Sequence, residues 1–336
     1  MSHPHALPIE MTKPVVLITG NTVSDAAKDI LRKAGADVTY MSGPVSEATM
    51  LAQLAAADFN AILLRGSPPL TKKVIDAAKH LKIIAKHGVG VDSVDIDAAT
   101  ARGIVVVTAG DANADAVAEQ SIMFMLALAR ELPRYHRGLR EGKWEKGARV
   151  GREFRGRTVG IVGYGQIGSR TARLARALGA NVVLFSRSRI ADPEGMEVED
   201  NFERLLGRVD ILSLHCPLTD KTRGMIGEKE LRMMKPTALL INTSRGQVID
   251  EAALIDALKN GRLAGAGLDT FAEEPTDPKN PLIFLDNVIC TPHVSVLTEE
   301  AMARMGTAAA NNIVGYIQRG VCSTANVVNP AVLKSA

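Results

Sequence analysis

Three short segments in the second half of the chain each carry one side chain suited to acid–base or electrostatic catalysis. Arg245 lies in NTSRGQVIDE, Glu274 in LDTFAEEP and His293 in TPHVS. An arginine can offer a planar pair of hydrogen-bond donors, and a histidine can exchange a proton near neutral pH. Each residue alone has an ordinary structural explanation. All three follow apolar runs, however, and together they favour a catalytic set.

A glycine turn, GYGQIG at 163–168, predicts a dinucleotide-binding site. It follows an apolar run and opens a helical pattern at Gln166–Arg173, which is the strand–turn–helix context that such a motif requires. Gly163 would allow the tight turn, Gly165 would let the backbone approach a pyrophosphate, and Gly168 would permit close packing of helix on strand. A simple turn between strand and helix is the alternative interpretation of these glycines.

The segment VVLFSRSR (182–189) predicts that the cofactor is NADP. Ser186 stands where dinucleotide folds that use NAD carry an acidic residue. A serine there removes the repulsion that a carboxylate would exert on a 2′-phosphate. Arg187 or Arg189, with Ser188 between them, can offer charge-assisted hydrogen bonds to phosphate oxygens. If both arginines are solvated loop residues instead, the protein would use either NAD or NADP.

Two successive arrays of strands and helices must position these segments. Short aliphatic runs alternate with helical patterns, which suits parallel sheets buried on both faces. We therefore predict an α/β protein with two doubly wound parallel-sheet domains, a Rossmann nucleotide-binding domain and a flavodoxin-like substrate domain. The expected strands are 15–18, 61–64, 82–85 and 104–107 in the first array, and 158–162, 181–185, 210–214, 238–242, 265–269 and 287–290 in the second.

The stretch between the two arrays differs from both. From Ala114 to about Lys146 the apolar residues fall at helical spacing, and Pro133 is expected to break the run in two. A last long helix is expected near 298–319. We expect the substrate domain to comprise 1–107 and 298–336, and the NAD(P)-binding domain to comprise 108–297. A cleft between the two domains would close on the substrate and exclude water.

Composition places the chain among ordinary globular enzymes. It has 336 residues, 46% of them hydrophobic, and a net charge of +3 with both signs interleaved, which argues against a nucleic-acid partner. Its three scattered cysteines argue against disulfides or a structural metal site. The N-terminus lacks the pattern of a secretion signal, and the strongest apolar run, Ile122–Ala129, is too short to span a membrane. We expect a cytoplasmic protein without a metal cofactor or a membrane partner.

The order of these motifs resembles the D-2-hydroxyacid dehydrogenase family, which includes phosphoglycerate dehydrogenases and glyoxylate/hydroxypyruvate reductases. Upstream segments are also similar to the family: KHGVGVDSVDIDAATARGI (86–104), ANADAVAEQ (112–120) and GKW (142–144). The resemblance covers the chain from about residue 50 to 318. It departs from the family at Gly110-Asp111, where Pro-Gly is frequent before Asn113, and at Gln120, where histidine is frequent.

The resemblance implies a role for each catalytic candidate. His293 would give its proton to the ketone oxygen during reduction, and Glu274 would hold the imidazole and raise its pKa. Arg245 would bind the substrate carboxylate and polarise the carbonyl. Hydride would pass directly between the nicotinamide and C2 of the substrate. Arg65 and the backbone of Val89 and Gly90 would complete the set of substrate contacts.

Further cofactor contacts follow from the same resemblance. His293 and Arg245 are expected to lie against the cofactor, and Asp269 is expected to face the nicotinamide amide. Asn113 would order the region between the domains, whereas His215 is expected to be structural. The full set of expected cofactor-binding residues is Gly163, Gly165, Gln166, Ile167, Gly168, Ser186, Arg187, Ser188, Cys216, Pro217, Thr243, Ser244, Arg245, Asp269, His293 and Ser295.

The substrate is less sharply indicated than the chemistry. An NADP pocket suits cellular reduction, and the chain ends without the regulatory domain that many phosphoglycerate dehydrogenases carry, so glyoxylate/hydroxypyruvate reduction is favoured. D-3-phosphoglycerate oxidation is the alternative, since Arg65 matches a position that can contact substrate in those enzymes. A formate dehydrogenase-like enzyme and a non-catalytic NAD(P)-sensing protein similar to some corepressors are further alternatives. A homodimer is expected, with the 115–146 helices as a candidate contact surface.

Overall fold

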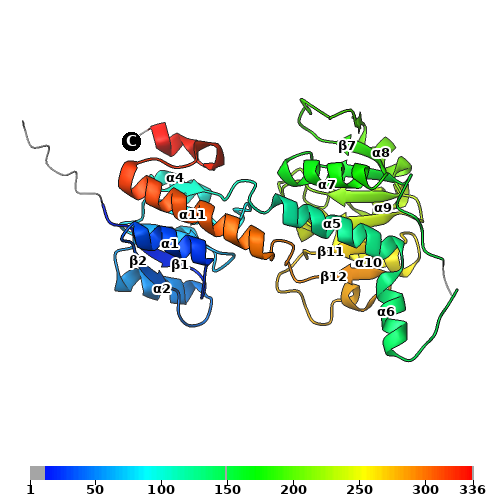
Figure 1. Ribbon diagram of the computed structural model, residues 1–336, viewed down its shortest axis with the longest axis horizontal. Helices are drawn as coiled ribbons and strands as arrows, with labels where there is room; N and C mark the ends of the chain where they lie inside the picture. Colours follow the sequence, from blue (N-terminus) through cyan, green and yellow to red (C-terminus); the bar gives the residue numbers. More distant parts are fainter. Residues whose placement is uncertain (1–11, 148–149, 335–336) are drawn as a thin grey trace, which may run out of the picture. The chain divides into compact units, whose positions relative to one another are not determined.

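The computed structural model describes residues 12–147 and 150–334, which form two compact units. Among these residues, the first unit combines 12–113 with 298–334, and the second comprises 114–147 and 150–297. Each unit is a parallel sheet with helices on both faces (Figure 1). The α/β fold class predicted from the sequence, two doubly wound parallel-sheet domains, is confirmed.

The sheet of the first unit has five strands in the order β2-β1-β3-β4-β5. Neighbouring strands run parallel throughout, and this order is that of flavodoxin-like folds. Its central strands are completely buried, because aliphatic side chains on both of their faces are covered by helices. The strands are β1 (Val15–Ile18), β2 (Asp37–Tyr40), β3 (Ala61–Leu64), β4 (Ile83–Lys86) and β5 (Val105–Val107).

Five helices cover this sheet. On one face lie α1 (Asp25–Lys33) and α11 (Glu299–Arg319), which pack against each other and bury side chains such as Leu31 and Ile313. The other face is covered by α2 (Glu47–Ala56), α3 (Lys72–Ala77) and α4 (Ile96–Ala101). Each of the five begins after a Ser, Thr or Asp whose side chain accepts a first-turn N–H, which fixes where the helix starts.

The sheet of the second unit has seven parallel strands in the order β12-β11-β10-β9-β6-β7-β8. Numbered within the unit, this is the Rossmann order with one added edge strand, and it reverses between β6 and β9. Open α/β sheets bind ligands at the carboxyl ends of the strands beside such a reversal. The strands are β6 (Thr158–Val162), β7 (Asn181–Phe185), β8 (Glu197–Val198), β9 (Ile211–Leu214), β10 (Leu239–Asn242), β11 (Gly265–Leu268) and β12 (Val288–Cys290).

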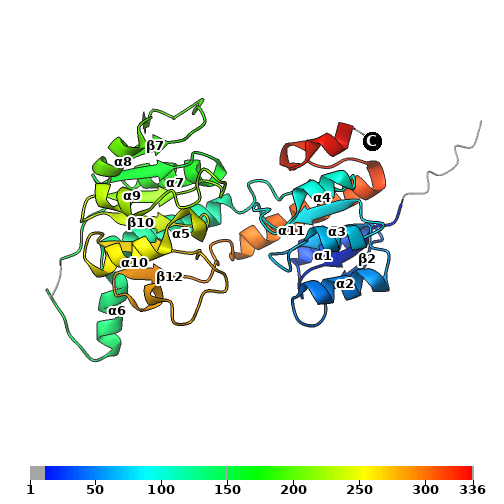
Figure 2. The ribbon, with the colours of Figure 1, turned by 180° about the vertical axis from the view of Figure 1, so that it is seen from behind.

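Helices cover both faces of this second sheet. Figure 1 shows α5 (Ala114–Ala129) and α7 (Gln166–Ala177) in front of it, and Figure 2 shows α8 (Phe202–Arg208), α9 (Glu228–Met233) and α10 (Glu251–Lys259) on the other side. The two layers enclose two apolar clusters, one against each face. A further helix, α6 (Leu132–Arg140), follows α5 after a short break.

Two boundaries differ in detail from the sequence-based expectation. The break between α5 and α6 falls at Glu131, whose backbone is left-handed, and Pro133 lies in the first turn of α6, where its missing N–H costs nothing. Residues 108–113 group with the first unit rather than the second. Their backbone is bonded there: Thr108 N–H donates to the Asn326 carbonyl (3.0 Å), and the Ala112 carbonyl accepts from Arg304 (2.9 Å).

No helix among residues 12–147 and 150–334 has the length and apolar character needed to cross a membrane.

Candidate active site

The loop that carries Arg245 is shaped by the last residue of β10. The buried side chain of Asn242 donates to the Arg245 carbonyl (2.9 Å) and accepts hydrogen bonds from the Ser244 N–H (3.0 Å) and hydroxyl (2.7 Å). Thr243 shares a hydrogen bond of 2.9 Å with Ser121 of α5, and both side chains are buried. The loop therefore leaves the sheet in one defined conformation, with the Arg245 side chain partly exposed.

The loop that carries His293 is held by Asp269, the first residue after β11. The buried Asp269 carboxylate accepts hydrogen bonds from the Thr291 hydroxyl (2.6 Å) and from the N–H groups of Val294 (2.8 Å) and Ser295 (3.0 Å), and the Ser295 hydroxyl also donates to it. The His293 N–H donates to the Asp269 carbonyl (2.8 Å), and the His293 backbone is left-handed. These contacts fix the direction of the imidazole. The expected contact of Asp269 with a nicotinamide amide stays a prediction.

Glu274 and His293 form a hydrogen-bonded ion pair. Glu274 Oε2 lies 2.7 Å from His293 Nδ1, and Glu274 Oε1 accepts the Phe271 N–H at 3.1 Å. The bond to Glu274 raises the pKa of His293 above its ordinary value, although burial and the charge of Arg245 oppose it. Burial alone would raise the pKa of Glu274, but the hydrogen bond and charge of His293 lower it. The pair therefore favours an ionised carboxylate beside a protonated imidazole.

The three catalytic candidates lie within electrostatic reach of one another. The positive charge of Arg245 lowers the pKa of both Glu274 and His293, and the charge of Asp269 raises the pKa of His293. The residues follow β10, β11 and β12, adjacent parallel strands whose carboxyl ends share one edge of the sheet. The structure thus brings together a guanidinium and a carboxylate-supported imidazole from separate loops.

The glycine turn has the shape that a dinucleotide needs. Gly163 has a φ of +95°, and a Cβ at Gly168 would lie 1.9 Å from the Gly163 carbonyl oxygen. By contrast, a Cβ at Gly165 would meet no described atom within 4 Å. Gly165 directly precedes α7, and no side chain caps that helix start. Exposed N–H groups beside open space at the start of a helix fit a phosphate group, so the residues present fit the implied cofactor.

The end of β7 lies next to this turn. The Gly163 N–H donates to the Phe185 carbonyl (2.8 Å), so Ser186 follows directly beside the glycines. Ser186 accepts the Ser188 N–H at 3.2 Å. The arginines that follow, Arg187 and Arg189, are exposed, and neither forms an ion pair with a described residue.

The segment after β9, which begins with His215 and Cys216, lies close to both the glycine turn and Arg187. Burial raises the pKa of the Cys216 thiol, and the charge of Arg187 opposes that effect, so the Arg187 guanidinium lies within electrostatic range of Cys216. Pro217 follows and is exposed. The His215 N–H donates to the Val162 carbonyl (2.8 Å), and its imidazole lies 2.9 Å from the Ser213 hydroxyl. Burial lowers the pKa of His215 to about 3, which keeps the ring neutral.

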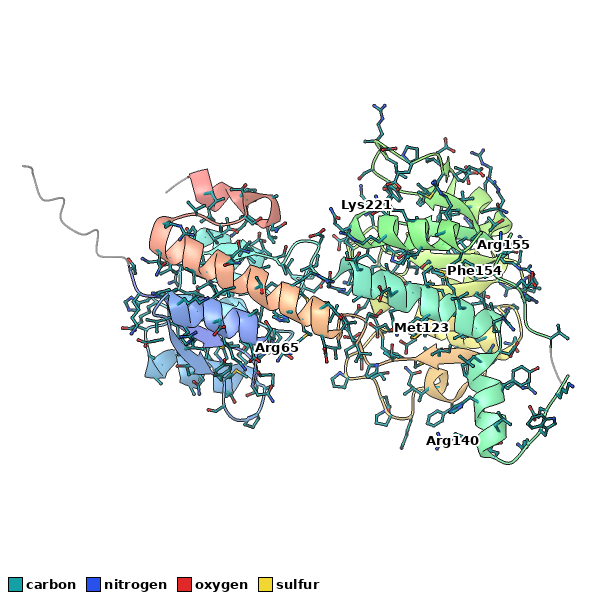
Figure 3. The ribbon with its side chains drawn as sticks, in the orientation of Figure 1. Arg65, Met123, Arg140, Phe154, Arg155 and Lys221 are labelled. Carbon is teal, nitrogen blue, oxygen red and sulfur yellow. The ribbon has the colours of Figure 1, made fainter. Side chains whose placement is uncertain are left out.

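The first unit contains the other expected substrate contacts. Arg65 follows β3 in the first unit (Figure 3). Its side chain donates to the Thr22 carbonyl (2.8 Å) and forms no ion pair with a described carboxylate. Val89 is 40% exposed in the loop after β4, next to Gly90. His87 is buried there, and burial together with the charge of Arg65 lowers its pKa to about 4. Nothing in the local sequence pattern marks His87 as a site residue, since it lies in the glycine-containing segment that follows β4.

The positions where the chain departs from the family pattern lie near the catalytic loops or next to the unit boundary. Gln120 of α5 donates to the Thr291 hydroxyl (3.4 Å), which in turn donates to Asp269. Asn113 is buried at the end of the first unit. Gly110 has a φ of +64°, which suits glycine better than other residues.

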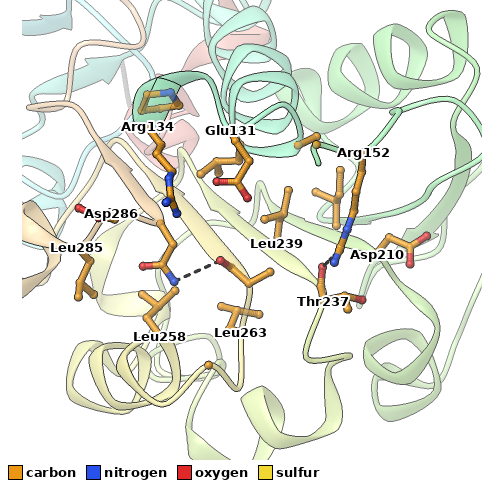
Figure 4. Close-up of a pocket in the computed structure, with 18 of the residues that line it drawn as sticks. Glu131, Arg134, Arg152, Asp210, Thr237, Leu239, Leu258, Leu263, Leu285 and Asp286 are labelled. Atoms are coloured by element: carbon orange, nitrogen blue, oxygen red, sulfur yellow. Dashed lines mark hydrogen bonds between the residues drawn. The ribbon is translucent and has the colours of Figure 1, made fainter. Parts of the chain in front are cut away.

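One cavity of about 700 Å³ lies away from these residues. It opens at the amino ends of the strands of the second unit, lined by residues that precede or begin β9, β10 and β11 (Figure 4). Arg152 there donates to the Thr237 carbonyl (2.7 Å). The cavity lies at the amino ends of the strands, whereas the catalytic candidates follow their carboxyl ends. It therefore contributes nothing to their chemistry.

Comparison with known proteins identifies the family of this chain. The family model for the NAD binding domain of D-isomer specific 2-hydroxyacid dehydrogenases matches residues 122–295. A glyoxylate reductase from Korarchaeum cryptofilum is 37% identical over 329 residues, which are 96% of this chain and 98% of that protein. The chain belongs to the D-isomer specific 2-hydroxyacid dehydrogenases.

Other members of the D-isomer specific 2-hydroxyacid dehydrogenases differ in length and name. A D-3-phosphoglycerate dehydrogenase from Archaeoglobus fulgidus is 40% identical over 302 residues, 89% of this chain, and the match spans only 56% of that longer protein. Among solved structures, an NADPH-dependent glyoxylate/hydroxypyruvate reductase from Sinorhizobium meliloti, in complex with NADP and malonate, is 30% identical with a TM-score of 0.82, covering 95% of this chain and 98% of that one.

Proposed function

We propose that the protein is an NAD(P)-dependent oxidoreductase that interconverts small 2-keto acids and D-2-hydroxy acids. The observation that carries this proposal is the Glu274–His293 pair, with Nδ1 and Oε2 2.7 Å apart and within electrostatic reach of Arg245. The glycine turn at 163–168 follows a strand of the same parallel sheet, at the same carboxyl ends of the strands. An arginine for the carboxylate and a proton donor for the ketone are the two groups that this reduction requires.

His293 is proposed as the acid–base. Its Nδ1 is engaged by Glu274, so Nε2 is the atom that would give a proton to the substrate oxygen in reduction and take it back in oxidation. The raised pKa keeps that proton available near neutral pH. Arg245 would bind the carboxylate and polarise the carbonyl. Arg65 and the backbone of Val89 and Gly90 are proposed as further substrate contacts.

The cofactor is proposed to be NADP, with NAD possible. The turn at 163–168 would hold the pyrophosphate, and Ser186, Arg187 and Ser188 would hold the adenosine ribose and its phosphate. Residues after β9 to β12 would line the nicotinamide part, namely Cys216, Pro217, Thr243, Ser244, Asp269 and Ser295. When bound, the nicotinamide supplies or accepts the hydride. Support for NADP comes from Arg187 and Arg189, which form no ion pair with a described residue, and from the related reductase in complex with NADP.

Glyoxylate or hydroxypyruvate reduction is the proposed reaction. It agrees with the names of the related reductases and with an NADP pocket. D-3-phosphoglycerate oxidation is the second candidate, because a relative of that name is 40% identical and because Arg65 lacks a carboxylate partner among the described residues and could meet a phosphate. We also propose a homodimer that works in the cytoplasm, with no nucleic acid, membrane or metal partner.

A substrate panel tests the proposal. Glyoxylate, hydroxypyruvate and 3-phosphohydroxypyruvate are assayed by the loss of NADPH and NADH absorbance. We expect the two smaller acids to be the better substrates. His293→Ala should lower kcat by about 100-fold or more while NADPH binding stays close to normal.

The matched control is His80→Ala, since His80 is exposed in the first unit, and this variant should keep full turnover. Absence of turnover with every 2-keto acid, or an unchanged kcat in His293→Ala, would overturn the proposal.

A further inference from the structure

The backbone of Ala272 forms two hydrogen bonds with side chains of the segment that follows Arg245. Its N–H donates to Glu251 Oε2 (3.0 Å), and its carbonyl accepts a hydrogen bond from Gln247 Nε2 (2.6 Å). Gln247 lies two residues after Arg245, and Glu251 is the first residue of α10. The backbone of a single residue in the loop that carries Glu274 is thus hydrogen-bonded to the segment that follows Arg245.

Backbone contact brings these two loops together. A Cβ on Gly246 would lie 1.9 Å from the Phe271 carbonyl carbon, so only a glycine permits this approach. Phe271 in turn donates its N–H to Glu274 Oε1. At the far end of the same loop, Asn280 donates to the second oxygen of Glu251 (2.7 Å). Glu251 therefore bridges both sides of the loop that presents Glu274.

We propose that Gln247 and Glu251 are positioning residues that fix Glu274, and through it His293, relative to Arg245; this rests on the proposed function. The segment 269–280 has no regular secondary structure and holds exposed residues around Glu274. Its conformation must therefore be fixed by bonds to other segments. The Gln247 and Glu251 contacts serve this purpose, since they join the two loops whose side chains act on one substrate.

The consequence is a defined effect on proton transfer. Glu274, Asp269 and Arg245 are the charged groups that act on His293, and the bond to Glu274 is the largest of these effects. A loosened Glu274 would lower the pKa of His293 toward its ordinary value. Reduction needs the protonated imidazole and is lost as pH rises through that pKa, so loosening would shift this loss to lower pH.

The test compares Glu251→Ala and Gln247→Ala with Glu203→Ala. Glu203 is also an acidic residue in the first turn of a helix on the same face of the sheet. It lies in α8, between β8 and β9, and pairs with Lys229. The pKa of His293 is measured by NMR on isotope-labelled histidine without substrate, with His293→Ala to assign the signal. The pH dependence of kcat/KM for 2-keto acid reduction is measured in parallel.

We expect a lower His293 pKa and about a 10- to 100-fold loss of kcat/KM in the Glu251 and Gln247 variants, with NADPH affinity little changed. Glu203→Ala should behave like the wild type. A folded Glu251→Ala that keeps both the wild-type His293 pKa and kcat/KM would overturn the proposal, and Gln247→Ala answers the same question if Glu251→Ala does not fold. Because the NMR titration needs no turnover, failure of the proposed function leaves this test intact.

Discussion

His293 owes its affinity for a proton to one partner acting against two opposing influences. Burial and the positive charge of Arg245 both lower its pKa, and only the 2.7 Å bond to Glu274, helped by Asp269, raises it. The same arginine lowers the pKa of Glu274 and so keeps the carboxylate charged. A substrate carboxylate placed on Arg245 would neutralise the opposing charge, so substrate binding should strengthen the protonated state of His293.

At the end of β7, we predict that Arg187→Ala changes cofactor preference. Loss of charge-assisted hydrogen bonds worth about 1.5–3 kcal/mol should lower kcat/KM with NADPH by about 10- to 100-fold while the value with NADH stays nearly constant. The ratio of the two kcat/KM values is the measurement. Arg155→Ala is the control, since that exposed arginine precedes the amino end of β6, whereas Arg187 follows the carboxyl end of β7 in the same sheet (Figure 3). A constant ratio in Arg187→Ala would show that another residue selects the cofactor.

At the scale of elements, local sequence predicted the buried strands well and the exposed ones poorly. The expected strands at 158–162 and 181–185 match β6 and β7 to the residue, because continuous aliphatic runs need cover on both faces. Neither β2, with the sequence DVTY, nor the two-residue β8 was expected. Both carry polar, exposed side chains at a sheet edge, and their strand conformation depends on pairing with a neighbour.

The site shows the same division between local and distant signals. Arg245, Glu274 and His293 could be proposed because each has a suitable chemical type at the end of an apolar run. The contacts of Gln247 and Glu251 with the backbone of Ala272 could not be predicted from the sequence. They join a side chain of one segment to the backbone of another loop. Such pairings depend on which strands are neighbours, and sequence periodicity does not report that.

The glycine turn offers a matched pair of substitutions within one element. Gly168→Ala places a methyl group 1.9 Å from the Gly163 carbonyl oxygen, so the turn must shift, and we expect a loss of stability of about 1–3 kcal/mol. Gly165→Ala meets open space and has a negative φ, so its thermal stability should match the wild type. Its NAD(P)H affinity should nevertheless fall by about tenfold or more, a cost of about 1.4 kcal/mol.

Thermal melts and cofactor titrations of both variants distinguish these effects. Normal cofactor binding in Gly165→Ala would mean that the backbone at this position does not approach the pyrophosphate.

At the scale of the whole molecule, the α6 surface of the second unit exposes several large apolar side chains. Leu132 and Leu139 of α6 are 59% and 58% exposed, and Trp144 beyond the helix is 82% exposed. Glu145 lies 3.8 Å from Arg134, so the segment carrying Trp144 folds back along α6. Large apolar side chains gathered on one surface usually mark an interaction site. The homodimer proposed above would give this α6 surface a function, with a second copy of the chain covering it.

The chain carries its own probe for this surface, because Trp144 is its single tryptophan. We predict a mass of twice 35.8 kDa by light scattering and blue-shifted tryptophan emission that moves toward the solvent-exposed spectrum on dilution. Leu139→Glu should give a folded monomer with the solvent-exposed spectrum at every concentration, since a charge buried at the centre of such a contact has no partner. Val45→Glu, at an exposed apolar residue of the first unit, should remain dimeric. A wild-type mass of 35.8 kDa with solvent-like emission at all concentrations would contradict the predicted dimer.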